Sequence, residues 1–161
     1  MITIFVGILV AVLFILPFIL LGIKKNKGGK HLKEALSKIA KENKCLITIS
    51  EYLADSAIGL DEKANHLFFV HTFNGKETFQ HLILSDYHHC EAKNISRNVK
   101  NSKGNFKAID KIKLAFIPIN QNKPIVDLDF FNSDENTNIS DEIMVIEKWE
   151  KTINKRMKMH T

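Results

Sequence analysis

The sequence has little cysteine, proline or glycine, with 2 Cys, 3 Pro and 7 Gly among 161 residues. So few Gly and Pro exclude a collagen-like or low-complexity chain, and 45% hydrophobic residues argue against a largely disordered one. Two cysteines are too few for the disulfide framework that stabilises small secreted domains. The length allows one ordinary domain.

Acidic residues are absent from the first 33 positions, and the first 23 carry no charge at all. The lysines before Glu34 account for the formal net charge of +5, because the remaining basic and acidic residues balance. The positive charge therefore belongs to one short segment. It gives no argument for a nucleic-acid partner, and none is expected.

An uninterrupted apolar run extends from Met1 to Ile23. As a helix it would be roughly 34 Å long, enough to cross a hydrocarbon core of about 30 Å. We therefore expect residues 1–23 to form a transmembrane helix, with the lipid bilayer as a partner. The alternative is a cleaved signal peptide, which is disfavoured because no basic residue precedes the run and no small-x-small site follows it.

Lysines follow this run on one side only, and positive flanking charge stays on the cytoplasmic side of a membrane. The sequence thus predicts a single-pass inner-membrane protein with its N-terminus outside and its domain in the cytoplasm. An extracytoplasmic domain with Cys45 and Cys90 bridged is the inverted alternative. The membrane-flanking basic residues are Lys24, Lys25, Lys27 and Lys30.

Residues 24–44 predict a basic juxtamembrane segment and a short amphipathic helix, whose apolar side chains recur at helical spacing from Leu32 to Ala40. This stripe is expected to pack on the domain, although it could also lie on a membrane surface. The domain itself is expected over residues 45–161.

Strand signals dominate from Cys45 onward. Asn74-Gly75 predicts a tight hairpin turn between strands at 66–73 and 78–84. Alternation predicts strands around Ile112–Phe116 and Val126–Phe130, whereas the polar stretch 94–107 is expected to be a mobile loop. A final helix over roughly 140–157 has one apolar stripe containing Trp149. This gives a mainly β fold of about seven antiparallel strands, closed into a barrel or sandwich and capped by the C-terminal helix.

The order of these elements resembles small bacterial pleckstrin-homology-like (PH-like) domains that follow a membrane anchor. The segments that carry the resemblance are residues 56–70, 85–92, 109–116 and 143–153. It implies a domain that binds lipids, peptides or proteins, without a common catalytic centre. Members that bind phosphoinositides use a basic cluster between the first two strands, but here that region is EYLAD (51–55), so headgroup binding is not implied.

Histidine and cysteine cluster at His88, His89 and Cys90, with further histidines at positions 66, 71 and 81. Adjacent strand residues point to opposite faces, so a metal site would require a cross-strand histidine beside His88 and Cys90. Asp127 and Asp129 share a strand face at roughly 7 Å, a spacing that could serve acid–base chemistry or metal binding. A solvated strand face is the simpler interpretation.

No nucleotide-binding, nucleophile-elbow, zinc-protease or C-x-x-C motif occurs in the sequence. We therefore expect no enzyme activity, no cofactor and no catalytic residues. The predicted function is that of a membrane-anchored binding or scaffolding module with a protein or peptide partner, bound beside the C-terminal helix or at an exposed strand edge. The surface between the Trp149 helix and Val126–Phe131 is favoured. The alternative is a membrane-tethered enzyme or metal-binding domain that uses the His/Cys or Asp127/Asp129 clusters.

Overall fold

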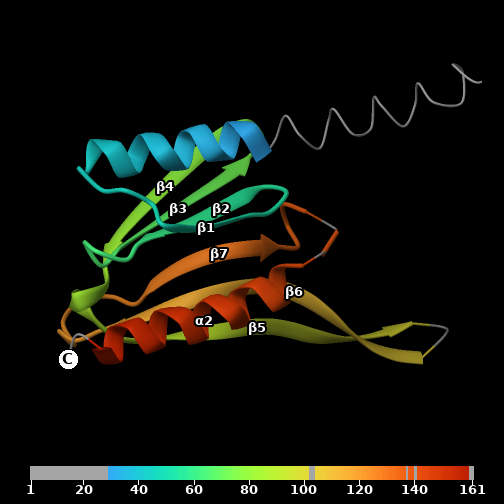
Figure 1. Ribbon diagram of the computed structural model, residues 1–161. Helices are drawn as coiled ribbons and strands as arrows, with labels where there is room; N and C mark the ends of the chain where they lie inside the picture. The colour runs from blue at the N-terminus through green and yellow to red at the C-terminus, as the bar shows by residue number, and fades with distance from the viewer. Residues whose placement is uncertain (1–28, 102–103, 137, 140, 160–161) are drawn as a thin grey trace, which may run out of the picture.

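Four antiparallel strands form the first sheet in the order of the chain, as the computed structural model shows (Figure 1). They are β1 (Ile49–Tyr52), β2 (Ser56–Asp61), β3 (His66–Phe73) and β4 (Lys76–Ile83). Asn74 and Gly75 have φ values of 50° and 75°, which confirms the tight turn predicted between β3 and β4. The structure describes residues 29–101, 104–136, 138–139 and 141–159.

Three strands, two of them 15 residues long, form the second sheet after a short 3₁₀ turn at Leu84–Asp86. They are β5 (Tyr87–Asn101), β6 (Gly104–Pro118) and β7 (Val126–Asn132). The prediction of a loop over 94–107 is wrong, because β5 and β6 remain paired through this stretch. They extend beyond β7 as a protruding hairpin (Figure 1). Neither face of this hairpin is covered by the core, so its sequence lacks the alternation that marks a half-buried strand.

The main core lies where the two sheets and α2 (Glu142–Met159) meet. Leu67 and Phe69 contribute from the first sheet, Leu114 and Leu128 from the second, and Trp149 from α2. Trp149 is 1% exposed. The apolar stripe predicted for the C-terminal helix is therefore confirmed as the face that α2 buries.

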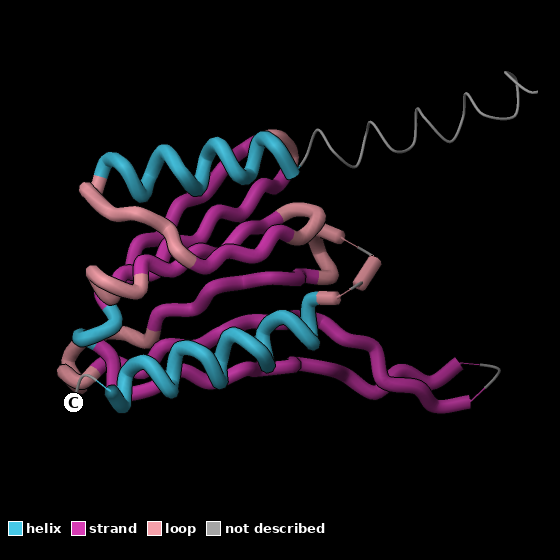
Figure 2. Tube along the Cα trace, in the orientation of Figure 1, coloured by secondary structure: helices cyan, strands magenta, loops and turns pink. Residues whose placement is uncertain are grey.

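A second core lies on the outer face of the first sheet, under the N-terminal helix (described over residues 29–42). Leu32 and Leu36 of the helix pack there with Phe68 and Val70 of β3. Gly59 of β2 permits close packing, because a Cβ at this position would lie 2.9 Å from a side-chain carbon of Leu36. The amphipathic helix thus packs on its own domain, with its lysines outward. Figure 2 shows it lying over the first sheet.

The closed barrel expected from the sequence is wrong. Within the part of the chain that is described, the strands form two separate sheets, and no ladder joins β1 or β4 to the second sheet. The reason is that α2 occupies the space between β1 and β5, while polar side chains line the gap between β4 and β7.

The membrane localisation expected from the sequence is also corrected. No helix in the described residues is long and apolar enough to cross a bilayer. Both described helices are apolar on one face only, and each buries that face against a sheet. The proposed transmembrane segment, residues 1–23, lies outside the described residues, as do Lys24, Lys25 and Lys27. The described structure gives no support for single-pass insertion or for an inner-membrane location.

Candidate binding groove

The side of the sandwich between β1 and β5 is closed by α2. Ile146, Trp149 and Ile153 point into the main core from this helix. On its outer side, Lys148 Nζ lies 2.6 Å from Glu51 Oε2 of β1. The helix therefore contacts both edge strands at once and seals this side with apolar packing.

Side chains of α2 also occupy the free backbone edge of β5. The Cys90 N–H donates to Asn154 Oδ1 at 2.9 Å, and Asn154 Nδ2–H donates to the Cys90 carbonyl at 2.8 Å. The Ala92 N–H donates to Glu150 Oε1 at 2.9 Å. A carboxamide that both donates and accepts replaces one peptide unit of a neighbouring strand. The exposed edge that β5 would otherwise offer to a peptide beside the C-terminal helix is thus occupied by side chains of α2 at Cys90 and Ala92.

The opposite side of the sandwich, between β4 and β7, has no such closure. In the described residues β4 pairs only with β3, and β7 pairs only with β6. Among the described residues, one side-chain hydrogen bond joins these two strands, from Gln80 Nε2–H to the Asp127 carbonyl at 3.1 Å. The gap holds a groove of about 310 Å³, called the β4–β7 groove below, lined by Phe69, His71, Thr78, Gln80, Asp127, Asp129 and Glu135.

The inner face of the first sheet changes from apolar to polar as it reaches this groove. The register places Leu67 opposite Leu82, then Phe69 opposite Gln80, then His71 opposite Thr78. Residues two apart along a strand share a face, so these pairs form one continuous surface. The core therefore ends at Phe69, and hydrogen-bonding side chains line the surface beyond it.

Carboxylates dominate the charge of the groove. Lys113 Nζ lies 2.5 Å from Asp127 Oδ2, and His71 Nε2 lies 3.6 Å from Glu135 Oε2. Asp127 Oδ1 is buried without a hydrogen-bond partner, and Asp129 has no ion pair with any described residue. Three carboxylates thus face one lysine and one histidine. This excess of acceptors and negative charge suits a ligand that brings N–H donors and positive charge.

The Asp127/Asp129 pair lies at the rim of this groove and not in an enclosed pocket. As the alternation predicted, both residues share a face of β7, and Lys113 on the adjacent strand neutralises one of them. Among residues 29–159 as described, no group of three or more Asp, Glu, His or Cys side chains is placed to hold a metal ion. The arrangement gives no support for acid–base or metal chemistry at this pair.

The predicted His/Cys cluster does not assemble. His88 is exposed, and His89 Nε2 lies 3.1 Å from Glu91 Oε1. Cys90 is buried beneath α2, where burial, followed by the nearby carboxylates of Glu150 and Glu91, raises the pKa of its thiol to about 12. A thiol with such a pKa is protonated at neutral pH and is a poor nucleophile or metal ligand. The histidines of the neighbouring strands lie elsewhere: His66 and His81 contact each other beside Cys45, and His71 lines the β4–β7 groove.

A contact that the sequence did not reveal joins Cys45, His66 and His81. Cys45 Sγ and His81 Nε2 lie 3.2 Å and 3.1 Å from His66 Nδ1, and the His81 ring stacks on Phe68. Burial raises the pKa of Cys45, and burial together with His66 lowers the pKa of His81. Both groups therefore favour their neutral forms. We interpret this cluster as packing under the N-terminal helix. Cys45 and Cys90 are both free and lie in different cores.

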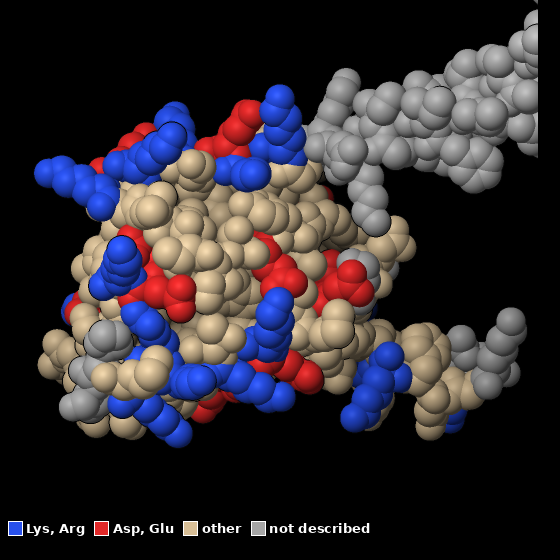
Figure 3. Space-filling model, viewed as in Figure 1, with Lys and Arg blue, Asp and Glu red and all other residues tan. Residues whose placement is uncertain are grey.

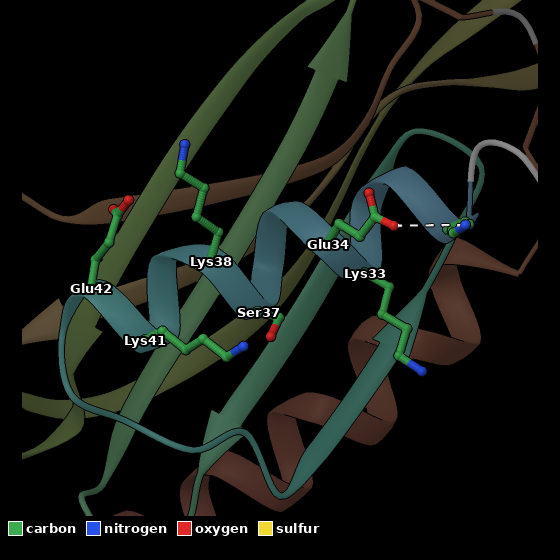
Figure 4. A pocket seen from close by; sticks show the side chains of 7 residues that line it. Lys33, Glu34, Ser37, Lys38, Lys41 and Glu42 are labelled. Carbon is green, nitrogen blue, oxygen red and sulfur yellow. Dashed lines mark ion pairs between the residues drawn. The ribbon is translucent and has the colours of Figure 1, made fainter.

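A hollow of about 640 Å³ lies on the N-terminal helix (Figure 4). Its lining comes only from this helix, so it is an open surface and not an enclosed site. Of the four lysines predicted to flank the membrane, Lys30 is the one within the described residues, and its Nζ lies 4.0 Å from Glu34 Oε1. The lining residues are Lys30, Lys33, Glu34, Ser37, Lys38, Lys41 and Glu42.

Comparison of the chain with known protein families, with characterised proteins and with solved structures gave no match. The interpretation of the β4–β7 groove therefore depends on its own geometry and charge.

Proposed function

We propose that this chain is a non-catalytic binding module of PH-like type, which captures an extended segment of a protein partner in the β4–β7 groove. The observation that carries the proposal is the contrast between the two sides of the sandwich. The edge of β5 is occupied by Asn154 and Glu150, whereas β4 and β7 each lack a second strand partner among the described residues. An extended peptide that adds to an unpaired strand edge gains main-chain hydrogen bonds there.

Two further features support this proposal. Along the chain, a four-stranded sheet is followed by a three-stranded sheet and then by a C-terminal helix. This order supports the proposal because the PH-like resemblance rests on the same order of elements. The acidic lining favours a segment in which Lys or Arg alternates with β-prone residues, since alternate side chains of an added strand face the same surface.

The test uses the full chain and a synthetic twelve-residue peptide that alternates Lys and Val. We expect the peptide to bind, and we expect its affinity to fall about tenfold when Asp129→Lys reverses one groove charge. A peptide with a central Pro should also bind more weakly, because Pro removes a backbone donor. Fluorescence anisotropy of the labelled peptides measures each affinity.

The matched control is Glu147→Lys, which makes the same charge change at an exposed position of α2. It should leave the affinity for the peptide nearly unchanged. Equal losses in the two variants would mean that the peptide responds only to net charge. That result, or the absence of binding, would reject the groove as the binding site.

A further inference from the structure

The protruding β5–β6 hairpin is the least covered part of the described chain. From the Ser96–Ile109 pair outward, its two strands pair only with each other. We call residues 96–101 and 104–109 the arm, which leaves out residues 102 and 103 because they lie outside the described residues. It extends well past the ends of the other strands (Figure 1). A two-stranded hairpin is marginally stable by itself in water, so a partner that covers the arm would stabilise it.

The two faces of the arm differ: Arg97, Val99, Phe106 and Ala108 share one face, and Lys100 and Lys107 lie on the other. Val99 is opposite Phe106, which is 48% exposed. Lys100 follows Val99 and Lys107 follows Phe106 in the chain. Because adjacent residues of a strand point to opposite faces, both lysines lie on the other face. No acidic residue occurs between Ala92 and Ile109. In the view of Figure 3 the arm shows basic side chains and no acidic ones.

The β4–β7 groove has the opposite charge. Residues 124–147, which include its Asp127, Asp129 and Glu135, contain no lysine, arginine or histidine. The domain beyond Lys33 is balanced in total charge, yet its charges are separated into a basic arm and an acidic groove. Complementary patches on different parts of one molecule favour head-to-tail association of copies.

We propose that the arm of one copy of this chain occupies the β4–β7 groove of a second copy. This inference rests on the proposed function, because it identifies the extended segment that the groove accepts. The free edge of the arm adds to β4, and Lys100 or Lys107 approaches the carboxylates of Asp129 and Glu135. The contact joins two different surfaces, so each copy retains one free arm and one free groove. Association then continues into rings or open filaments.

The experiment uses two variants of the full chain. The arm variant carries Lys100→Glu and Lys107→Glu, and the groove variant carries Asp129→Lys. Sedimentation velocity should show wild-type oligomers that grow with protein concentration and dissociate in about 0.5 M salt, where charge attraction is screened. Each variant alone should be a monomer.

Mixing the two variants gives the decisive result. The arm variant retains a working groove and the groove variant retains a working arm, so an equimolar mixture should form a dimer of one copy of each. The remaining arm and groove of this dimer carry reversed charges that again attract each other, so growth beyond the dimer would also support pairing of the arm with the groove. As a control, Lys155→Glu together with Glu147→Lys changes exposed charges of α2 and should associate as wild type does.

A wild-type chain that stays monomeric, a mixture that stays monomeric, or a control that loses association equally would overturn the inference. Thermal unfolding of each variant checks that it is folded. Where a charge reversal unfolds the chain, Lys107→Gln and Asp129→Asn replace it. If the chain is monomeric but its groove still binds the Lys/Val peptide, the proposed function stands and the occupant is another protein. If neither the arm of a second copy nor the Lys/Val peptide binds to the groove, both proposals fail.

Discussion

The two open sides of the sandwich are closed by different means. Between β1 and β5, α2 inserts Trp149 into the core and satisfies the β5 edge with Asn154 and Glu150. Between β4 and β7 of the described chain, one hydrogen bond from Gln80 crosses the gap, and carboxylates line it. An exposed strand edge can pair with another chain, so proteins protect edges that have no partner to bind. The β5 edge is thus protected, whereas β4 and β7 each lack a second strand partner among the described residues.

The largest difference is expected in the chemical reactivity of Cys90 on the closed side. In a Cys45→Ser variant, Cys90 is the remaining thiol, and its alkylation at pH 8 should be about a thousandfold slower in the folded than in the unfolded chain. The reason is its burial together with the raised pKa of about 12. Iodoacetamide labelling followed by mass spectrometry measures both rates.

The raised pKa of Cys90 also sets the sign of the pH dependence of the free energy of unfolding. The folded pKa of Cys90 is above its unfolded value of about 8.5, so this group lowers stability as pH rises above about 8.5, where the unfolded thiol ionises first. Rapid labelling of the folded chain at pH 8 would show that α2 does not seal this side.

Trp149→Ala is expected to have the largest effect on the free energy of unfolding, a loss of about 3–5 kcal/mol. Trp149 is almost fully buried where the sheets and α2 meet, so its truncation leaves a cavity that the neighbouring side chains do not fill. Trp149→Phe should cost less, because Trp149 Nε1 has no hydrogen-bond partner to lose. Urea denaturation measures both. A loss below 1 kcal/mol for Trp149→Ala would contradict the role given to α2.

Asn154→Ala should cost less, about 1–3 kcal/mol, because it removes two hydrogen bonds from the β5 edge and leaves part-buried backbone groups unpaired. Its local signature is faster hydrogen exchange at the Cys90 amide. Lys155→Ala, at an exposed neighbouring position, is the control and should change neither quantity. Unchanged exchange at Cys90 in the Asn154 variant would show that the carboxamide does not protect this edge.

The smallest effect is expected on the open side. Gln80→Ala removes its hydrogen bond to the Asp127 carbonyl across the β4–β7 gap and should cost about 0.5–1.5 kcal/mol, because water can reach the groups it leaves behind. The same urea denaturation measures it. A loss greater than that of Asn154→Ala would mean that this side is structurally closed, which would weaken the distinction between the two edges.

Local signals in the sequence were sufficient for several elements. The Asn74-Gly75 turn, the buried alternation of Ile112, Leu114 and Phe116, and the Trp149 stripe of the C-terminal helix are all confirmed. Each depends on neighbours in the chain or on burial of one face, which periodicity reports directly. The arm was missed for the converse reason, since strands exposed on both faces lack that period.

The candidate site depended on contacts between residues far apart in the chain. The sequence placed Asp127 and Asp129 on one strand face, but only the register brings Lys113 to Asp127 and Gln80 across from β4. No periodicity predicts that Asn154 imitates a strand beside Cys90. The cluster of Cys45, His66 and His81 also required the fold of the chain after the N-terminal helix.

Hydrogen exchange of the edge amides, measured on the full chain with and without the Lys/Val peptide, tests the central claim most directly. Cys90 and Ala92 should be protected in both samples, because α2 already bonds their N–H groups. The outward-facing amides of β4 and β7 should exchange rapidly alone and slow down when the peptide is present. Protection gained at Cys90 and Ala92, with no change along β4 and β7, would contradict the account.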